Sequence, residues 1–396
     1  MLRDSSMLDR FQARVREGNA TVCCVFGTRP EAIKLAPLVA GLRAEPGFTG
    51  RVVVTSQHRE MLDQVLGLFG IEPDADLDVM QKDQSLFQVA SRCLRGLEQA
   101  FFRLSPDMVV VQGDTLTTFC AALGAFFLKI PVAHVEAGLR TWDKFDPFPE
   151  EMNRVLASRI ADWHLAPTRS ARENLLREGV PEERIFVTGN TVIDAAQEIA
   201  RKTAEFTRDT LRRVPFSEKR VILVTAHRRE SFGVPYREIC EALRDTVLEH
   251  PTVHVLFPYH MNPNASGPAK EILGGEASVT LVPPLDYPDL VLAMRRAWAV
   301  VTDSGGIQEE APAFGKPVLV LREKTERPEA VSAGTVKLVG NRYRGVRDAL
   351  RELLENPGVY QGMCCAVNPY GDGKATERIL EVFRTGTLRR PFEPER

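Results

Sequence analysis

The chain has 396 residues, of which 44% are hydrophobic and 26% are charged, and its formal net charge is −2. This composition is typical of a globular protein of about two domains. Because the charges nearly balance, general electrostatic binding to nucleic acid or to a membrane surface is excluded, and any anion site must be local.

The beginning of the chain differs from the rest. Residues 1–20 are polar and charged with no apolar core, so we expect an extension and not a signal peptide. No apolar run reaches about 18 residues, so we expect no membrane span and a cytoplasmic location. The seven cysteines form no CxxC pair. They are expected to be core thiols, with no metal site.

Short apolar runs alternate with longer amphipathic stretches in the first half. The predicted strands are 22–26, 52–55, 108–112 and 132–136, and the predicted helices are 30–43, 58–69, 84–103 and 114–129. Pro30 suits the first position of its helix. Continuous apolar strands alternating with helices predict a doubly wound α/β domain with a parallel sheet, over residues 21–203.

The alternation weakens over 200–218, where we place the linker, and then resumes. The next predicted strands are 221–226, 253–257, 279–283, 299–303 and 317–321, and the predicted helices include 286–297 and 305–315. Asp286 is a candidate cap. The pattern predicts a second Rossmann-like domain over 204–372. A C-terminal helix near 373–385, within the segment 373–396, is expected to pack back on the first domain.

Polar clusters follow several predicted strands. They are GTRPE at 27–31, QGDT at 112–115, EAGLRT at 136–141, TAHRRES at 225–231 and DSGGIQEE at 303–310. Ligands of open α/β sheets bind beyond the carboxyl ends of the strands. We therefore expect the two domains to face each other across one cleft that holds all five clusters.

The stretch GTRPEAIK carries two cations at a strand-to-helix junction. A helix N-terminus attracts anions, Arg29 adds a forked donor and Lys34 a point charge. The alternative is an ordinary solvated turn with surface charges. There is no GxGxxG and no GxxxxGK[ST] motif, so dinucleotide and P-loop sites are not indicated.

Two clusters in the second half also suit an anion. His227 and Arg228 directly follow a strand, where positive groups favour a diphosphate whose charge grows as it leaves. A charged loop is the alternative. Ser304, Gly305 and Gly306 open a helix, and glycine allows close approach of the backbone to a ligand. Glu309 and Glu310, one turn on, are candidate acceptors for ribose hydroxyls, although carboxylates in an early helical turn are also common for capping reasons alone.

Three carboxylates are candidate acid–base groups. Asp114 and Glu136 end strands, and Glu150 begins a helix after a proline-containing loop. Taken singly, each is more often a cap or an ion-pair partner. Together, on one sheet edge facing a cationic site, they favour proton transfer. His260 lies among apolar residues, and no HxxH spacing accompanies it to indicate a metal.

At these residues the chain resembles the non-hydrolysing UDP-N-acetylglucosamine 2-epimerases of bacteria. The blocks that carry the resemblance, in family order over about 22–386, include FGTRPEAIKLAPLV, QHREMLDQVL, HVEAGLRT, PEEMNR, GNTVIDA, HRRESFG, VTDSGGIQEEAP and NPYGDG. The resemblance implies a GT-B fold, interconversion of UDP-GlcNAc and UDP-ManNAc without NAD or metal, and a homodimer.

The resemblance also implies roles for particular residues. The catalytic set is Asp114, Glu136, Glu150 and His227. The UDP contacts are Arg29, Lys34, His227, Arg228, Ser304, Gly305, Gly306 and Glu310. A second, activating substrate molecule would meet Gln57, Glu60, Gln84, Glu150, Arg228 and His260. Two residues depart from the family pattern, namely Asp83, where some members carry arginine, and Trp142, where a small residue is common.

The chemistry explains why such residues are needed. The proton on C2 of the sugar is poorly acidic, so loss of UDP from C1 must accompany its removal, giving 2-acetamidoglucal. Return of UDP with the proton on the other face completes the epimerisation. The alternatives are a GT-B glycosyltransferase, a hydrolysing epimerase and a non-enzymatic nucleotide-sugar sensor.

Overall fold

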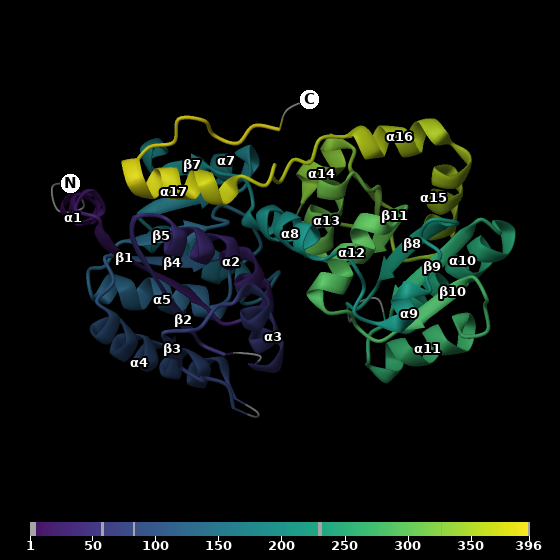
Figure 1. Cartoon of the computed structure of the whole chain (residues 1–396), viewed down its shortest axis with the longest axis horizontal. Coiled ribbons are helices and arrows are strands. Elements are labelled where there is room, and N and C mark those ends of the chain that lie inside the picture. The colour runs from purple at the N-terminus through teal and green to yellow at the C-terminus, as the bar shows by residue number, and fades with distance from the viewer. Residues whose placement is uncertain (1–4, 57–58, 82–83, 229–231, 326, 395–396) are drawn as a thin grey trace. The chain divides into compact units, whose positions relative to one another are not determined.

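The computed structural model describes residues 5–56, 59–81, 84–228, 232–325 and 327–394, without the side chains of residues 5, 6, 59 and 60. The chain folds into two compact units (Figure 1). Unit 1 comprises the chain up to Ala195 together with Gly371–Glu393, and unit 2 comprises Ala196–Tyr370.

Unit 1 is built on a parallel seven-stranded sheet in the order β3-β2-β1-β4-β5-β6-β7. Its strands are β1 Asn19–Phe26, β2 Gly47–Val54, β3 Ala75–Asp76, β4 Met108–Gln112, β5 Val132–Val135, β6 Trp163–Ala166 and β7 Ile185–Val187. The strand order reverses at β1, which pairs with both β2 and β4. All residues of β4 and β5 are buried, as expected for parallel strands covered on both faces.

Helices alternate with these strands. They are α1 Ser5–Arg16, α2 Arg29–Ala44, α3 Arg59–Phe69, α4 Leu86–Leu104, α5 Leu116–Phe127, α6 Glu150–Ile160, α7 Arg169–Arg177 and α17 Ala375–Thr385, with a 3-10 turn Glu182–Arg184 before β7. Helices α4, α5 and α6 cover one face of the sheet through a core that includes Leu97, Phe101 and Ala121. Thr28 occupies the N-cap of α2, so Pro30 stands at the second helical position and not at the first.

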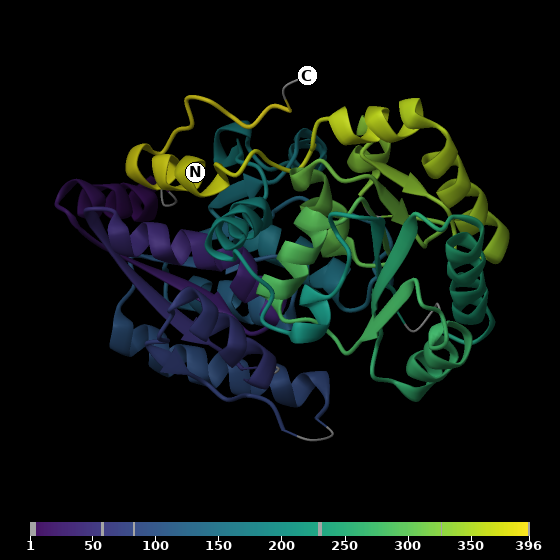
Figure 2. The same cartoon turned by 45° about the vertical axis from the view of Figure 1, so that its right-hand side comes forward.

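The two ends of the chain meet on unit 1. Phe11 of α1 is 1% exposed, and its ring centroid lies 5.8 Å from that of Trp163 and 6.1 Å from that of Phe383 in α17. Figure 2 shows α1 beside α17. The tail beyond α17 reaches the last strand of the sheet, where the Phe392 N–H donates to the Val187 carbonyl at 2.7 Å. The residues before β1 thus include a helix with a buried aromatic anchor.

Unit 2 is built on a parallel six-stranded sheet in the order β10-β9-β8-β11-β12-β13. Its strands are β8 Arg220–Thr225, β9 Val253–Pro258, β10 Val279–Val282, β11 Ala299–Thr302, β12 Val318–Val320 and β13 Val336–Leu338. β8 and β11 are neighbours in register, with Thr225 opposite Thr302. The polar residues that follow these two strands are therefore brought to one edge.

Helices alternate with the strands of unit 2 as well. They are α9 Asp209–Arg212, α10 Val234–Glu249, α11 Pro263–Leu273, α12 Tyr287–Arg296, α13 Gly305–Glu310, α14 Pro328–Ala333, α15 Tyr343–Glu355 and α16 Pro357–Cys365, with a 3-10 helix Ala311–Phe314 after α13. Helix α8, Thr191–Lys202, crosses the division of the chain into units.

Two local predictions need correction in unit 2. The helix expected over 305–315 is a six-residue α-helix followed by a 3-10 turn, because Pro312 cannot continue the α-helical hydrogen bonding. Asp286 holds the N-cap position of α12, but its side chain makes no capping hydrogen bond. The main β-α alternation of both halves is confirmed.

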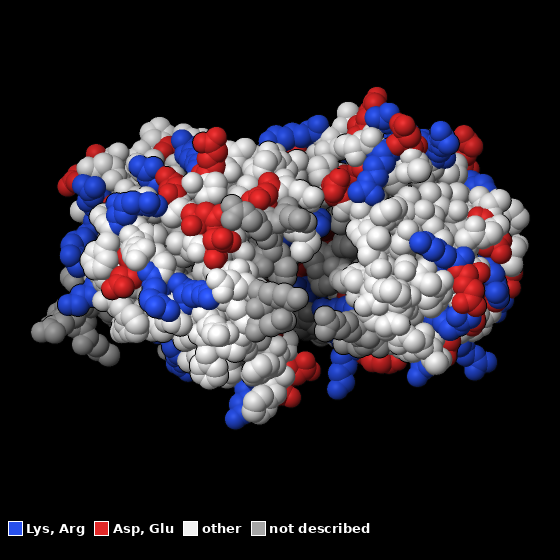
Figure 3. Space-filling model, turned by 90° about the horizontal axis from the view of Figure 1, so that it is seen from below, with Lys and Arg blue, Asp and Glu red and all other residues white. Residues whose placement is uncertain are grey.

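The surface agrees with the near-neutral composition. On the face seen in Figure 3, basic and acidic side chains are interspersed over both units. Within the described residues, no helix is long and apolar enough to cross a membrane. All cysteines are free thiols, and five of them are buried, whereas Cys364 is half-buried and Cys365 exposed.

Candidate active site

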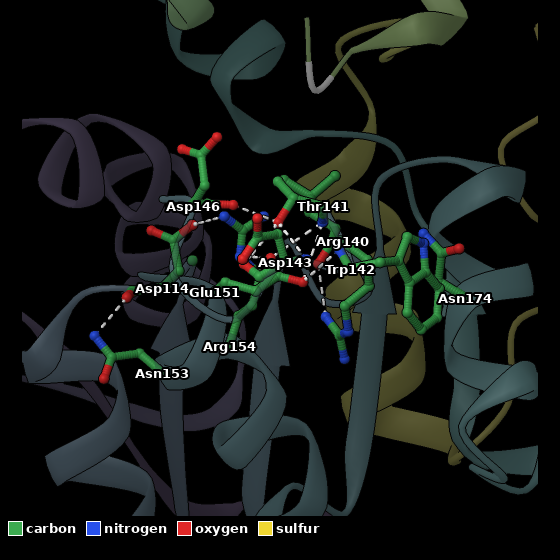
Figure 4. Close-up of polar contacts among 12 residues, drawn as sticks. Asp114, Arg140, Thr141, Trp142, Asp143, Asp146, Glu151, Asn153, Arg154 and Asn174 are labelled. Carbon is green, nitrogen blue, oxygen red and sulfur yellow. Dashed lines mark hydrogen bonds and ion pairs between the residues drawn. The ribbon is translucent and has the colours of Figure 1, made fainter. Parts of the chain in front are cut away.

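The turn after β4 is held by side chains from two other elements. The carbonyl of Gly113 lies 2.7 Å from Nε2 of His134 on the neighbouring strand β5. The next carbonyl, that of Asp114, accepts from Nδ2 of Asn153 in α6 at 3.0 Å (Figure 4). Gly113 itself has a positive φ of 69°, which favours glycine. The backbone that carries Asp114 is therefore fixed from two sides.

The Asp114 carboxylate is paired with a cation and only partly accessible. Its Oδ2 lies 3.2 Å from a guanidinium nitrogen of Arg154, and 31% of the side chain stays accessible. Protein atoms nevertheless crowd the carboxylate, and desolvation raises its pKa, as do the charges of Glu136 and Glu150, while Arg154 and Lys34 oppose the rise. A raised pKa suits a group that exchanges protons near neutral pH.

Glu136 lies beside it, immediately after β5. Its carboxylate is nearly buried and accepts from Lys34, from the Gln112 amide and, at 3.0 Å, from Asn190. The residue adopts φ +63°, an unusual conformation for glutamate. Such local strain is common at functional sites. Lys34, expected as a diphosphate contact, is thus paired with a catalytic candidate in this structure.

Sequence reasoning did not single out Gln112 or Asn190. Both are buried, and both donate to Glu136. Gln112 ends β4, and Glu136 follows the neighbouring strand β5. The adjacent ends of these two predicted strands could therefore have indicated that Gln112 contacts Glu136. Asn190 comes from the β7–α8 turn, and only the fold brings it to this place.

The two glutamates that begin α6 have different roles. Glu150 is half-buried, and its charge contributes to the raised pKa of Asp114. Glu151 is 2% exposed and accepts from the backbone N–H groups of Thr141, at 3.1 Å, and Trp142, at 3.0 Å (Figure 4). Glu151 therefore holds the loop after β5.

Trp142, expected to depart from the family pattern, lies in the loop after β5. It has φ +66° and remains 52% exposed, and the Arg177 guanidinium lies 5.1 Å from its ring centroid. The neighbouring Arg140 is buried and makes a two-pronged pair with Glu178 at 2.7 and 2.9 Å. The loop after β5 is thus anchored at both of these positions.

Unit 2 places its own polar cluster at the ends of β8 and β11. Asp303, fully buried, accepts from the backbone N–H groups of His227 and Arg228, each at 2.8 Å. Its other oxygen lies 3.1 Å from Nδ1 of His227, whose side chain is 48% exposed. Burial raises the pKa of Asp303, but the hydrogen bonds and charge of His227 outweigh it, and the pKa is lowered.

This contact orients His227. An ionised aspartate at Nδ1 favours the tautomer with its proton on that nitrogen and leaves Nε2 facing outward from the pair. Sequence reasoning found His227 and missed Asp303, although the TDSGG stretch ends β11 beside β8.

The SGG turn is confirmed as a helix start, with Ser304 at the N-cap of α13. A Cβ on Gly305 would lie 2.6 Å from a guanidinium nitrogen of Arg327, so a larger residue here would displace that guanidinium. Arg327 is held by Glu309 at 2.6 Å. Arg327 is therefore a further cation at this turn, which sequence reasoning missed.

The remaining predicted residues are more dispersed. Glu310 is 6% exposed and accepts from the Tyr287 hydroxyl at 3.2 Å. His260, after β9, is exposed and accepts from the Asn262 N–H at 3.1 Å. Gln84 accepts from the Gln81 N–H at 2.6 Å.

The other predicted residues are half-buried or lie outside the described residues. Arg29 is half-buried at the first position of α2, and Gly306 is half-buried in α13. Gln57, Asp83 and the side chain of Glu60 lie outside the described residues. Across the described ranges, no group of three or more histidine, cysteine or acidic side chains is arranged to hold a metal ion.

Two parallel Rossmann-like units, each with polar turns at the carboxyl edge of its sheet, define a protein of the GT-B fold class. The chain belongs to the UDP-N-acetylglucosamine 2-epimerase family, whose sequence model matches residues 40–384.

Individual relatives cover almost the whole chain. The UDP-N-acetylglucosamine 2-epimerase of Salmonella typhimurium is 52% identical over 92% of this chain and 98% of its own length. The crystal structure of UDP-GlcNAc 2-epimerase from Neisseria meningitidis bound to UDP-GlcNAc has a TM-score of 0.84 and 45% identity, covering 91% of this chain and 99% of that chain. The crystal structure of the Methanocaldococcus jannaschii UDP-GlcNAc 2-epimerase in complex with UDP-GlcNAc and UDP has a TM-score of 0.75 and 32% identity. The match covers 91% of this chain and 99% of that chain.

Proposed function

We propose that the chain interconverts UDP-GlcNAc and UDP-ManNAc without hydrolysis, by elimination and re-addition of UDP. The observation that carries this proposal is the pair of carboxylates at adjacent strand ends, Asp114 and Glu136, with the pKa of Asp114 raised by desolvation. Membership of the epimerase family supports the choice of substrate.

The electron balance of the reaction requires no oxidant. The C2–H bond breaks, its electron pair forms the C1–C2 double bond, and the C1–O bond breaks with its pair passing to UDP. In the return step the UDP oxygen adds to C1, and a proton is delivered to the opposite face of C2. Asp114 is the preferred base, with Glu136 and Glu150 as partners in proton return.

The departing diphosphate needs positive charge and hydrogen-bond donors. In unit 2 these are His227, Arg228 and the turn Ser304–Gly306, with Arg327 held beside Gly305. In unit 1, Arg29 opens α2. Preorganised donors at a departing oxygen supply much of the rate in such reactions.

The test is incubation with UDP-GlcNAc in D2O. We expect deuterium at C2 of both sugar nucleotides with no net release of UDP. Glu136→Gln should bind UDP but lose exchange, whereas Glu182→Gln, a surface carboxylate of unit 1, should behave as wild type. Accumulating free UDP and ManNAc would indicate a hydrolysing epimerase. A requirement for an acceptor would indicate a glycosyltransferase, and binding without turnover would indicate a sensor.

We also propose activation by a second UDP-GlcNAc molecule. The residues assigned to it are Gln57, Glu60, Gln84, Glu150, Arg228 and His260. His260 lies with its ring centroid 6.0 Å from that of Phe232 and is exposed to a ligand. A sigmoidal rate curve is expected, and His260→Ala should weaken activation more than UDP binding. Identical hyperbolic curves for both proteins would contradict the second site.

A homodimer is the third part of the proposal. Neighbouring helices α4 and α5 expose large apolar side chains, with Phe102 65%, Phe126 59% and Phe127 65% exposed. A contiguous exposed apolar patch marks an interaction site, and we assign these phenylalanines to the dimer interface. Light scattering should give twice the chain mass, and Phe126→Asp should give the monomer. Leu248→Asp, at an exposed leucine of α10, is the control and should remain dimeric.

A further inference from the structure

We propose that Glu31 is a positioning residue that couples the turn carrying Arg29 to the turn carrying Asp114. This inference rests on the proposed function, in which the first turn meets the diphosphate and the second removes the C2 proton. Glu31 stands at the third position of α2 and is 2% exposed.

One oxygen of Glu31 belongs to its own turn. Oε2 accepts from the N–H of Gly27 at 3.1 Å, the N–H of Thr28 at 2.8 Å and the Thr28 hydroxyl at 2.7 Å. The bond to the N-cap N–H is one half of a capping box, which by itself would be an ordinary device for starting a helix. The bonds from the N–H groups of Gly27 and Thr28 to Oε2 fix the backbone directly before Arg29.

The other oxygen has no capping explanation. Oε1 accepts from the hydroxyl of Thr115 at 2.6 Å, and Thr115 lies 84 positions further along the chain. Thr115 follows Asp114 directly and is the N-cap of α5, where its hydroxyl oxygen accepts from the Thr118 N–H at 3.2 Å. A single buried carboxylate thus spans the starts of two helices.

The packing behind Glu31 leaves the first turn little room to move. A Cβ on Gly27 would meet the Thr55 hydroxyl oxygen at 2.0 Å and that of Thr117 at 2.6 Å. Those two hydroxyls are 2.8 Å apart and hydrogen-bonded to each other. The two turns therefore touch through a buried polar layer, in which Glu31 accepts from both sides.

The donor pattern indicates why a carboxylate occupies this position. Two backbone N–H groups and the Thr28 hydroxyl approach Oε2, and the hydroxyls of Thr115 and Thr118, at 2.6 and 3.3 Å, approach Oε1, so both oxygens must accept. Desolvation raises the pKa of Glu31, and the bonds from Thr115, Thr28 and Gly27 oppose the rise. A glutamine in this position could accept only at its oxygen. Its NH2 group would donate toward Thr115, so the Thr115 hydroxyl would have to accept instead of donate.

The first test weakens the contact between the two turns by changing Thr115 and leaving Glu31 in place. Thr115→Val deletes the shorter of the two hydroxyl bonds to Oε1, leaving that of Thr118 at 3.3 Å, and it also removes the N-cap of α5; Thr115→Ser retains both functions of the hydroxyl. We expect kcat of Thr115→Val to fall about tenfold to a hundredfold, because small misplacements of reacting groups have effects of this size. The dissociation constant of UDP should stay within about twofold, and Thr115→Ser should restore most of kcat.

Two further variants control for folding. Thr246→Val removes a buried hydroxyl of α10 that donates only to the Ala242 carbonyl at 2.7 Å, and it should leave kcat unchanged. Glu31→Asp keeps the charge but is too short to span both turns, so it should reproduce the kcat loss of Thr115→Val with UDP binding retained. The double variant Glu31→Asp/Thr115→Val should fall no further than the stronger single variant.

Hydrogen exchange separates failure of this inference from failure of the proposed function. If the turns are coupled, Thr115→Val should increase amide exchange in the peptide 24–34 as well as in its own turn, whether or not the protein is an epimerase. Unchanged exchange in 24–34, wild-type kcat in folded Thr115→Val, or additive losses in the double variant would each overturn the coupling. Wild-type protein without C2 exchange would overturn the proposed function instead.

Discussion

Two buried histidines make unit 1 sensitive to acid. His134 on β5 and His164 on β6 are direct partners in the sheet and are 0% and 1% exposed. Within the described chain, Nδ1 of neither ring has a hydrogen-bond partner. Desolvation lowers the pKa of His134 from 6.5 to about 4 and that of His164 to about 3. Those values include the charge of Arg140, which disfavours protonation of both rings, and for His164 also the charges of His134 and Arg184.

The sign of the effect follows from proton linkage. Both folded-state pKa values lie below 6.5, so the unfolded chain binds more protons than the folded one between pH 6.5 and the folded value. The free energy of unfolding therefore decreases as the pH falls through this window. From pH 7.5 to 5.5 each histidine should remove about 1.3 kcal/mol.

The perturbation is His164→Gln, which removes one of the two histidines without touching the turn that His134 holds. Wild type should lose about 1.3 kcal/mol more than the variant between pH 7.5 and 5.5, a difference of about 3–5 °C in melting temperature. His260→Gln, a replacement of an exposed histidine in unit 2, should retain the wild-type difference. Equal losses in wild type and His164→Gln would show that burial of His164 does not destabilise the folded state in acid.

Three further predictions concern side chains with well-defined contacts. Phe11→Ala should destabilise unit 1 by about 3–5 kcal/mol, because a buried aromatic ring is lost from the packing of α1, and thermal unfolding would measure it. Glu151→Ala leaves the N–H of Trp142 without its acceptor and should cost about 1–3 kcal/mol, with faster proteolysis of the 141–149 loop. Asp303→Asn should lower kcat about tenfold to a hundredfold with intact folding, since His227 loses the partner that sets its tautomer. Unaltered melting, digestion or turnover, respectively, would contradict each.

The main alternation of strands and helices could be predicted because parallel strands covered on both faces have continuous apolar sequences. MVVVQ at 108–112 and VILVT within 220–225 show this directly. The strand Trp163–Ala166 has the sequence WHLA, in which a buried histidine breaks the apolar pattern. The strand Val336–Leu338 lies at the sheet edge with a lysine in its centre. These strands are specified by pairing with neighbours and not by local composition.

The residues of the candidate site likewise include some that local sequence identifies and others that only the fold identifies. Residues at the ends of strong strands, such as Asp114, Glu136 and His227, could be chosen because chain position alone puts them at the ligand edge of a sheet. For their supporting partners, chain position does not show which side chain they contact. Asn190 is adjacent to Glu136 only after β7 has joined the sheet, and Asp303 is significant only because β11 lies beside β8.

Glu31 illustrates why this second group resists prediction. In the sequence it completes the pattern Thr-x-x-Glu, which a helix start explains fully. Its contact with Thr115 is created by the parallel pairing of β1 with β4, which places the turns after both strands side by side. The same pairing places Arg29 and Asp114 on turns that share one buried carboxylate. A change at Glu31 that weakened proton transfer while preserving UDP binding would therefore locate the coupling in the sheet topology itself.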